Sequence, residues 1–525
     1  MNSSSSVLLR GFSLILVAGA ILAVITLAPA LRPPVRFTLV ADGRVMSGEV
    51  RSQTVRQALE EAGIALGDLD RVDPDLWETV REGSVVIVTR VSQEERTVVE
   101  EIPFNRQVIP DEALPEGELK LVQGGVNGQE EIRYGLVYED GAEVERRVIA
   151  RRRLRQAQDE IVLVGAQGTL PSIPFSGTIV YLSHGNAWLM RHETGQKRPL
   201  TTSGDLDPRI FSLSSDGSQL LFAREQESGP LNTLWIVDTL VVGDPPQSLG
   251  IEGALWAEWV PDPSGLGTTR IAYGTGERTP AAPGWKAHNN LRLYSLEEGK
   301  DQELVAPGSG GLFGWWGTQF AWSPQGDRLA YANAGEVGII DARSGARRAL
   351  LSFPYYRTFS DWVWTPQLSW SPEGRFLAVS VHVPTEGSRP EESEAFELWV
   401  LAVEEGTALR VAEEVGMWAF PQWAPAPWGG EELLAFGRAQ APTHSRDSLY
   451  SLWLMDRDAS NERRLYPASG QASFAIEQLT PWIWSPSGDS LLLLSERNLH
   501  LIDIRSGLTQ QITLDGGVVR ARWAR

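Results

Sequence analysis

The C-terminal part of the sequence contains the stretch WSPQGDRLAY at residues 322–331. Two further copies follow, WSPEGRFLAV at residues 370–379 and WSPSGDSLLL at residues 484–493. In each copy an aromatic strand leads through a tight turn into an apolar strand. Proline fixes φ where the turn starts, and glycine supplies the left-handed position. Because degenerate copies begin at Leu213, Trp259 and Trp423, the motif predicts a series of β-hairpins.

A second short strand alternates with this motif and often ends in Asp. Its seven copies are residues 187–190, 234–238, 291–294, 337–341, 398–401, 452–456 and 499–503. A repeat of roughly fifty residues is the period at which propellers are expected. One copy cannot bury its faces alone, so the copies must stack, with the Trp before each turn packing between neighbouring blades.

The two ends of the repeat region complete each other. Residues 519–525 look like the aromatic strand without its partner, and residues 177–182 look like the partner without its aromatic strand. Joined, they complete a seventh unit and leave no free sheet edge. We therefore predict a mainly β chain with a seven-bladed β-propeller over residues 170–525, closed by the C-terminal strand. Six blades are the alternative, if one degenerate unit is an insertion.

These units resemble the WD40-like repeats of TolB-type propellers. The turn of that family carries Asp where this sequence has Gln325, Glu373 or Ser487. The resemblance implies the fold and says little about a ligand.

The N-terminus contains an uncharged apolar run at residues 11–31, long enough to span a bilayer as a helix. We predict a transmembrane signal anchor there, preceded by a short cytoplasmic segment at residues 1–10. This places a single-pass protein in the cytoplasmic membrane, with the bulk of the chain on the extracytoplasmic side. Ala28-Pro29-Ala30 resembles a cleavage site, so a cleaved signal peptide is the alternative. A buried core helix is the third possibility.

Residues 35–92 predict a small α/β domain. Strands are expected at residues 35–41, 44–50 and 84–91, and a helix at residues 55–62 between Thr54 and Gly63. The segment resembles the small ubiquitin-like domain found in resuscitation-promoting factors and related bacterial wall proteins.

Residues 93–167 contain long polar strands punctuated by glycines, among them Gly117, Gly128, Gly141 and Gly165. This segment resembles a G5 domain of bacterial surface proteins. The order of anchor, ubiquitin-like domain and G5 domain implies an envelope protein associated with the cell wall, and some G5 domains are proposed to bind amino sugars. The basic run at residues 151–155 either contacts an anionic polymer or is a solvated strand face.

Composition excludes several kinds of function. The formal net charge of −20 argues against nucleic acid as a partner, and the absence of cysteine excludes disulfides and thiolate sites. The six histidines show no metal-ligand spacing, and the closest two, His184 and His192, are expected at the surface. With no catalytic motif in the sequence, we predict no cofactor, no metal site and no enzymatic activity.

Tryptophan is the most distinctive residue type, with 20 copies in the chain. One subset falls outside the repeat positions, just before the expected inner strands, where connections crowd one face of a propeller around its channel. These residues are Trp256, Trp315, Trp316, Trp362, Trp364, Trp418 and Trp482. We expect them to line the channel mouth and bind a ligand, since flat aromatic faces suit sugar rings or an extended peptide. The alternative is that they extend the packing between blades.

The sequence therefore favours a membrane-anchored extracytoplasmic binding or scaffold protein. Its G5 and ubiquitin-like modules would associate with the cell wall, and its propeller would bind a cell-wall glycan or an envelope protein. One alternative is a propeller-type carbohydrate-active enzyme, a glycoside hydrolase or lyase. The other is an envelope assembly or sensor factor that acts through protein contacts.

Overall fold

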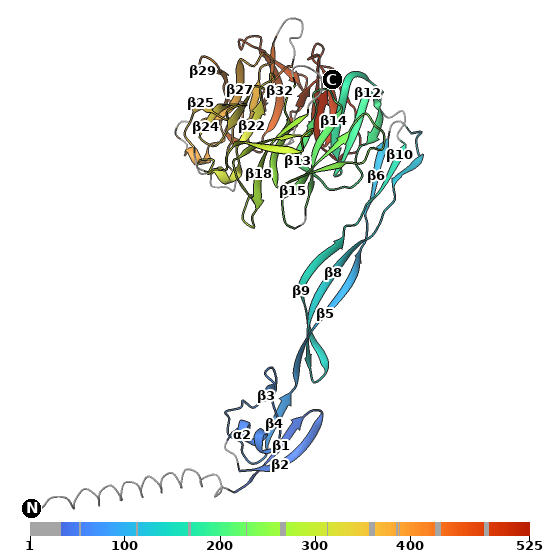
Figure 1. Ribbon diagram of the computed structural model, residues 1–525, viewed down its shortest axis with the longest axis vertical. Helices are drawn as coiled ribbons and strands as arrows, with labels where there is room; N and C mark the ends of the chain where they lie inside the picture. Colours follow the sequence, from blue (N-terminus) through green and yellow to red (C-terminus); the bar gives the residue numbers. More distant parts are fainter. Residues whose placement is uncertain are drawn as a thin grey trace, which may run out of the picture. The chain divides into compact units, whose positions relative to one another are not determined.

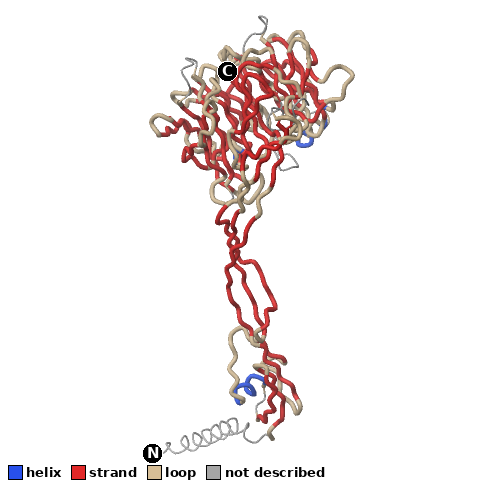
Figure 2. Tube along the Cα trace, turned by 90° about the vertical axis from the view of Figure 1, so that its right-hand side faces the viewer, coloured by secondary structure: helices blue, strands red, loops and turns tan. Residues whose placement is uncertain are grey.

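The computed structural model describes residues 33–51, 54–111, 114–165, 170–226, 228–262, 269–311, 313–355, 363–384, 387, 389–425, 432–476 and 482–525. The predicted cytoplasmic segment and the predicted anchor at residues 11–31 lie outside this part of the chain. Within it, no helix combines the length and the apolar character needed to cross a membrane. The chain forms two compact units: residues up to Phe104 with Val126–Ala157, and Asn105–Gly125 with Gln158–Arg525. Strands dominate both (Figure 2).

The first unit begins with the ubiquitin-like domain. Its sheet has the order β2-β1-β4-β3 and carries one short helix. The elements are β1 (Val35–Ala41), β2 (Arg44–Val50), α2 (Val55–Glu61), β3 (Arg71–Asp73) and β4 (Ser84–Thr89). Thr54 caps the helix through a reciprocal pair of bonds with Gln57, and Leu59 packs on Phe37 and Val86 in the core. The predicted strands and helix are confirmed, whereas β3 was not predicted.

The G5 segment divides between the two units. A sheet of β5 (Val91–Ile102), β8 (Gly128–Glu139) and β9 (Ala142–Arg155) belongs to the first unit. Every side chain of β9 is exposed, and Arg151 and Arg152 pair with Glu130 and Glu131 of β8 at 3.0 and 3.3 Å. The basic run is therefore a solvated strand face with its charge partly balanced.

A second G5 sheet belongs to the second unit. It consists of β6 (Arg106–Asp111), β10 (Glu160–Gly165) and β7 (Leu119–Gln123). Ile161 is fully buried and shares one apolar core with Ile179 and Trp188 of the neighbouring sheet. The two segments that the sequence analysis divides near residue 170 are thus joined by a common core, which sequence patterns did not predict.

The rest of the second unit consists of seven antiparallel sheets. The first has the order β39 (Val518–Ala524), β11 (Pro174–Ser183) and β12 (Asn186–Pro199). The second sheet has the order β13 (Leu206–Leu213), β14 (Gln219–Glu225), β15 (Asn232–Asp238), β16 (Gln247–Glu252). The third has the order β17 (Ala254–Trp259), β18 (Arg270–Arg278), β20 (Leu291–Ser295), β21 (Lys300–Val305), with β19 (Trp285–Ala287) beside β18. The fourth has the order β22 (Gln319–Trp322), β23 (Arg328–Ala332), β24 (Glu336–Asp341), β25 (Arg347–Ser352). The fifth sheet has the order β26 (Leu368–Trp370), β27 (Phe376–His382), β28 (Phe396–Ala402), β29 (Thr407–Ala412). The sixth has the order β30 (Gln422–Trp423), β31 (Leu433–Ala439), β32 (Leu449–Asp456), β33 (Arg463–Tyr466), with β34 (Phe474–Ala475) beside β32. The seventh has the order β35 (Trp482–Trp484), β36 (Ser490–Ser495), β37 (Asn498–Asp503), β38 (Thr509–Gln511).

The core of this region lies between successive sheets. Val180 and Leu182 of the first sheet, for example, pack with Phe211 and Phe222 of the second. The first strands of neighbouring sheets also approach one another, as β13 does with β17 and β39 and as β26 does with β22 and β30. Each sheet thus buries its faces against its neighbours, which makes the region propeller-like (Figure 1).

The C-terminal strand returns to the start of this region. β39 pairs antiparallel with β11, and Trp523 lies opposite Ile179 in the register. Figure 1 places the C-terminus beside β12. The pairing is the one expected from the sequence, and it removes the free edge that β11 would otherwise present.

The turn glycines serve both backbone conformation and packing. Gly326 has φ +68°, and a Cβ there would lie 2.5 Å from the carbonyl oxygen of Pro261 in the preceding turn. Gly217 has φ +71°, and its Cβ would lie 2.6 Å from the carbonyl oxygen of Arg525. Only glycine fits both demands, and the close approach brings successive turns together.

Candidate binding site

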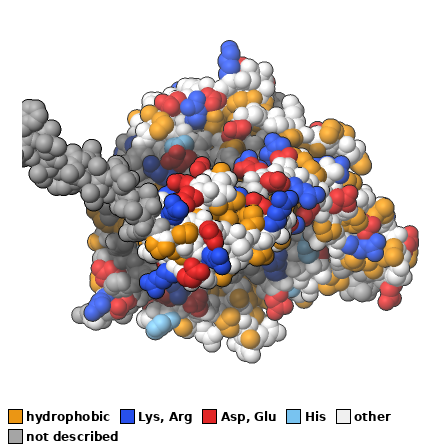
Figure 3. Space-filling view, turned by 90° about the horizontal axis from the view of Figure 1, so that it is seen from below, with side chains coloured by type: hydrophobic (Ala, Val, Ile, Leu, Met, Phe, Trp, Pro, Cys, Tyr) orange, Lys and Arg blue, Asp and Glu red, His pale blue; other side chains and the backbone are white. Residues whose placement is uncertain are grey.

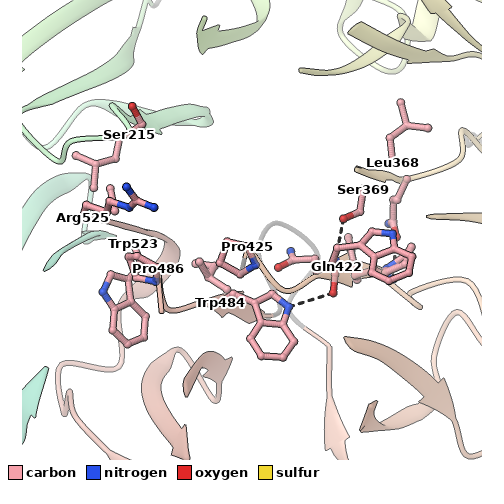
Figure 4. A pocket seen from close by; sticks show the side chains of 16 residues that line it. Ser215, Leu368, Ser369, Gln422, Pro425, Trp484, Pro486, Trp523 and Arg525 are labelled. Carbon is pink, nitrogen blue, oxygen red and sulfur yellow. Dashed lines mark hydrogen bonds between the residues drawn. The ribbon is translucent and has the colours of Figure 1, made fainter. Parts of the chain in front are cut away.

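The first strands of the sheets surround a central channel that opens into two adjoining cavities. Their volumes are about 530 and 480 Å³, and they share Leu213, Ser215, Leu368, Trp423 and other lining residues. The lining comes from the first strands and the turn prolines that follow them, and near β26 and β30 also from residues that precede the strand, such as Gln367 and Phe420. In Figure 4, Ser215 and Arg525 face Leu368 and Ser369 across the larger cavity.

Three charged side chains from distant parts of the sequence influence one another in this channel. Glu258 of β17 lines the second cavity, and Arg520 and Arg522 come from β39. Burial raises the pKa of the Glu258 carboxyl, and the charges of Arg522 and Arg520 oppose this rise. Burial likewise lowers the pKa of Arg522, with Glu258 opposing. The Asp207 carboxylate also acts on Arg520, so the two guanidinium groups are opposed by two carboxylates.

Arg520 ties the closing strand to the second sheet. Its Nη1 donates to the carbonyl oxygens of Pro208 at 2.6 Å and Arg209 at 3.2 Å. Its Nε is buried, with no hydrogen-bond partner in the described part of the chain. Burial, followed by the like charge of Arg522, lowers its pKa to about 9.

The predicted tryptophans form pairs and small groups instead of one lining. Trp256 packs on Phe320 with ring centroids 5.3 Å apart, and Trp364 packs on Phe396 at 4.3 Å. These contacts join side chains of successive sheets or their connections and resemble the packing alternative.

A second group joins Trp418 and Trp482 through one phenylalanine. Phe420 is stacked with Trp418 at 6.1 Å and lies edge-on to Trp482 at 6.2 Å. The Trp418 indole donates to the carbonyl oxygen of Arg446 at 2.8 Å. Trp482 is fully buried and offers no surface to a ligand.

Two consecutive tryptophans before β22 differ in their exposure to solvent. Trp315 is 43% exposed, whereas Trp316 is half-buried beside Trp285. Trp362 lies outside the described residues. None of the described tryptophans of this set lines either cavity, although Phe420, which contacts Trp418 and Trp482, lines the larger one. A binding role for the set stays a prediction.

The histidines and the acidic side chains of the described ranges form no metal site. Both His184 and His192 are exposed, as predicted. Among the described residues, no three His, Asp or Glu side chains are placed to hold a metal ion. On the face drawn in Figure 3, acidic and basic side chains are interspersed and not gathered by sign.

Comparisons with known proteins identify the N-terminal modules. Residues 93–167 match the G5 domain, and residues 37–76 match the G5-linked ubiquitin-like domain. The chain contains both domains. The solved structure of HP0197-G5 is similar to the G5 segment, at 26% identity over 14% of this chain and 99% of that chain, with a TM-score of 0.14.

The C-terminal region is structurally similar to TolB and lactonase β-propellers. A putative TolB from Agrobacterium tumefaciens matches at 18% identity over 61% of this chain and 96% of that chain, with a TM-score of 0.35. A putative 6-phosphogluconolactonase from Bacteroides uniformis matches at 13% identity over 66% and 99%, with a TM-score of 0.41. No curated protein sequence matches this chain.

Sequence reasoning missed the charged part of the channel. Glu258 and Arg520 lie on strands that meet only when the ring closes, so no local spacing relates them. The one available signal is the alternation of Arg520 and Arg522 in the closing strand, which places both on the same side of β39.

Proposed function

We propose that this protein is a membrane-anchored binding protein of the bacterial cell envelope, with its G5 and ubiquitin-like domains on the wall and its seven-bladed propeller holding a glycan or protein ligand. The domain pair supports an envelope location, because G5 domains are generally associated with the cell wall. The uncharged run at residues 11–31 supports the anchor.

One structural observation carries the proposal. The second G5 sheet and the first propeller sheet bury Ile161, Ile179 and Trp188 in a single core. A G5 segment bound to the wall would therefore hold the propeller at the wall, with the channel cavities open to a ligand. Such coupling suits a receptor or scaffold.

The test is co-sedimentation of the full chain with purified cell-wall sacculi, together with protease accessibility in intact and permeabilised cells. We expect retention on sacculi and digestion from outside the cytoplasmic membrane. Failure to bind sacculi combined with capture of a defined envelope protein would turn the proposal toward protein contacts. A chain protected from external protease would contradict the location.

The second candidate, a carbohydrate-active enzyme, is favoured by Glu258. A carboxyl with a raised pKa inside a cavity is what a general acid for glycoside cleavage requires. Release of new reducing ends from wall glycan by the full chain, abolished in Glu258→Gln, would establish this activity. Equal, background-level release by both proteins would remove it.

A further inference from the structure

Three aromatic side chains lie together on two connections that lead into first strands. Phe313 and Trp315 precede β22, and Tyr355 follows β25. The Phe313 ring stands edge-on to Trp315 at 5.2 Å and to Tyr355 at 6.4 Å. Trp315 is 43% exposed and Tyr355 52% exposed. We propose that this aromatic shelf, defined as Phe313, Trp315 and Tyr355, binds the C–H face of a pyranose ring in a wall glycan. The inference rests on the proposed function and names its ligand class.

The loop that carries Trp315 is firmly held. Buried Asn289 donates from Nδ2 to the carbonyl oxygen of Gly314 at 2.8 Å, and its Oδ1 accepts from Thr318 at 2.9 Å. A Cβ at Gly310 would lie 2.3 Å from Cγ of Asn289, so the backbone closes tightly around this amide. The exposure of Trp315 is thus built into the loop and is available without an ordering cost on binding.

The backbone at Phe313 is unusual for a bulky residue. Its φ of 61° and ψ of 17° lie in the left-handed region, which L side chains rarely adopt. Such strain persists where surrounding contacts hold it, and it tends to occur at binding sites. In this conformation the Phe313 ring contacts both exposed aromatic side chains.

Trp316, the next residue after Trp315, supports the loop from within. It lies edge-on to Trp285 at 6.0 Å, and the Trp285 indole donates to the Trp316 carbonyl oxygen at 3.1 Å. The Arg209 guanidinium covers the Trp285 ring at 5.4 Å. Packing therefore explains why position 316 carries a tryptophan. It does not explain the exposed tryptophan ring at position 315.

The chemistry of the shelf suits a neutral sugar. Aromatic faces attract the C–H side of a pyranose, and polar groups at the edge fix its hydroxyls. Tyr355 lies against Gly335, where an added Cβ would be 3.1 Å from Cδ1 of its ring. The net charge of −20 disfavours an anionic polymer.

The test measures binding of a soluble β-1,4-linked N-acetylglucosamine tetramer to the full chain by saturation-transfer NMR and calorimetry. We expect saturation of ring protons on one sugar face, and an affinity about fivefold to tenfold weaker in Trp315→Ala and in Tyr355→Ala. Leu409→Ala is the control, since Leu409 of β29 is an apolar side chain of the propeller region that is 66% exposed and lies outside the shelf. The control should bind like the unmodified chain, and all three variants should keep its Tm.

Three outcomes would overturn the inference: equal affinity in Trp315→Ala, equal weakening in Leu409→Ala, or no binding of the tetramer by the unmodified chain. Binding of an unstructured peptide at the shelf instead of the tetramer would also overturn it. Sacculus retention separates the two proposals. If Trp315→Ala binds both sacculi and tetramer normally, the shelf fails and the proposed function stands, whereas loss of sacculus binding by the unmodified chain removes the proposed function itself.

Discussion

The indole nitrogen of Trp484 donates a hydrogen bond to the carbonyl oxygen of Gln422 in the preceding sheet, at 3.0 Å (Figure 4). The same 3.0 Å bond joins Trp370 to Ala321 and Trp259 to Ser212. The aromatic residue of the turn motif therefore connects neighbouring sheets by a directed bond as well as by ring packing. Its recurrence in the sequence reflects the ring, and no ligand is needed to explain it.

This bond gives a direct stability test. Trp484→Phe keeps an aromatic ring but leaves the Gln422 carbonyl without its indole donor, and we expect the Tm of the propeller region to fall by about 2–4 °C. Trp322→Phe is the matched control, because Trp322 is buried to a similar degree while its indole nitrogen has no hydrogen-bond partner in the described part of the chain. Calorimetry measures the Tm of the propeller region in both variants. An equal fall in the two would show that ring volume, and not the bond, carries the effect.

Removal of the closing strand tests the ring itself. A chain ending at Gly517 loses β39, which exposes the edge of β11 and the apolar side chains of Ile179 and Tyr181. We expect loss of the cooperative propeller transition and self-association on a sizing column. Deletion of Arg525 alone should leave both properties near those of the full chain.

Rescue in trans sharpens that experiment. A synthetic peptide of residues 517–525 should pair with β11 and restore a monomeric, cooperatively unfolding protein. If the chain ending at Gly517 stays monomeric with an unchanged Tm, then β39 does not close the ring.

How far the sequence predicts this molecule depends on how local each feature is. The turn at Ser323–Gly326 and the pairing of residues 519–525 with β11 follow from repeated short patterns. Each repeat contains the same kind of strand, and that strand needs a neighbouring strand to pair with. Exposure does not repeat in this way. Trp315 and Trp482 hold comparable sequence positions, yet one is 43% exposed and the other 0%.

Features that need ring closure or contact between modules escaped prediction for the same reason. The charge of Arg520 acts on Glu258 only because the ring of sheets is closed. Ile161 and Trp188 share a core only because the G5 segment packs against the propeller. Alternation and spacing indicate which face of a strand is apolar, but they do not identify the surface that covers it.

Two half-buried histidines predict a dependence of stability on pH. Burial lowers the pKa of His382 and of His500 below the ordinary value of 6.5, so the folded chain binds these protons less tightly than the unfolded chain does. As pH falls through 6.5 the unfolded chain takes up these protons first, and the free energy of unfolding must decrease. We expect a level Tm from pH 8 to 7 and a falling Tm from pH 6.5 to 5.

A double variant isolates the histidines. His382 Nε2 donates to the Ser393 carbonyl oxygen at 2.7 Å, and a glutamine can keep a donor there without titrating. His382→Gln with His500→Gln should flatten the slope between pH 6.5 and 5, while the carboxylates with lowered pKa values, such as Asp341 and Asp503, act only at more acidic pH. An unchanged slope in the double variant would assign the effect to other groups.

The shared core between the G5 segment and the propeller predicts which unit each G5 residue stabilises. Ile132 of β8 and Ile161 of β10 are both buried, but they belong to different compact units. Truncation of a buried isoleucine to alanine costs about 2–5 kcal/mol. In calorimetry, where separate units melt separately, Ile161→Ala should lower the propeller transition and Ile132→Ala should lower only the other one. If Ile161→Ala left the propeller transition in place, the G5 segment would fold independently, and wall binding by G5 would hold the propeller through the covalent chain alone.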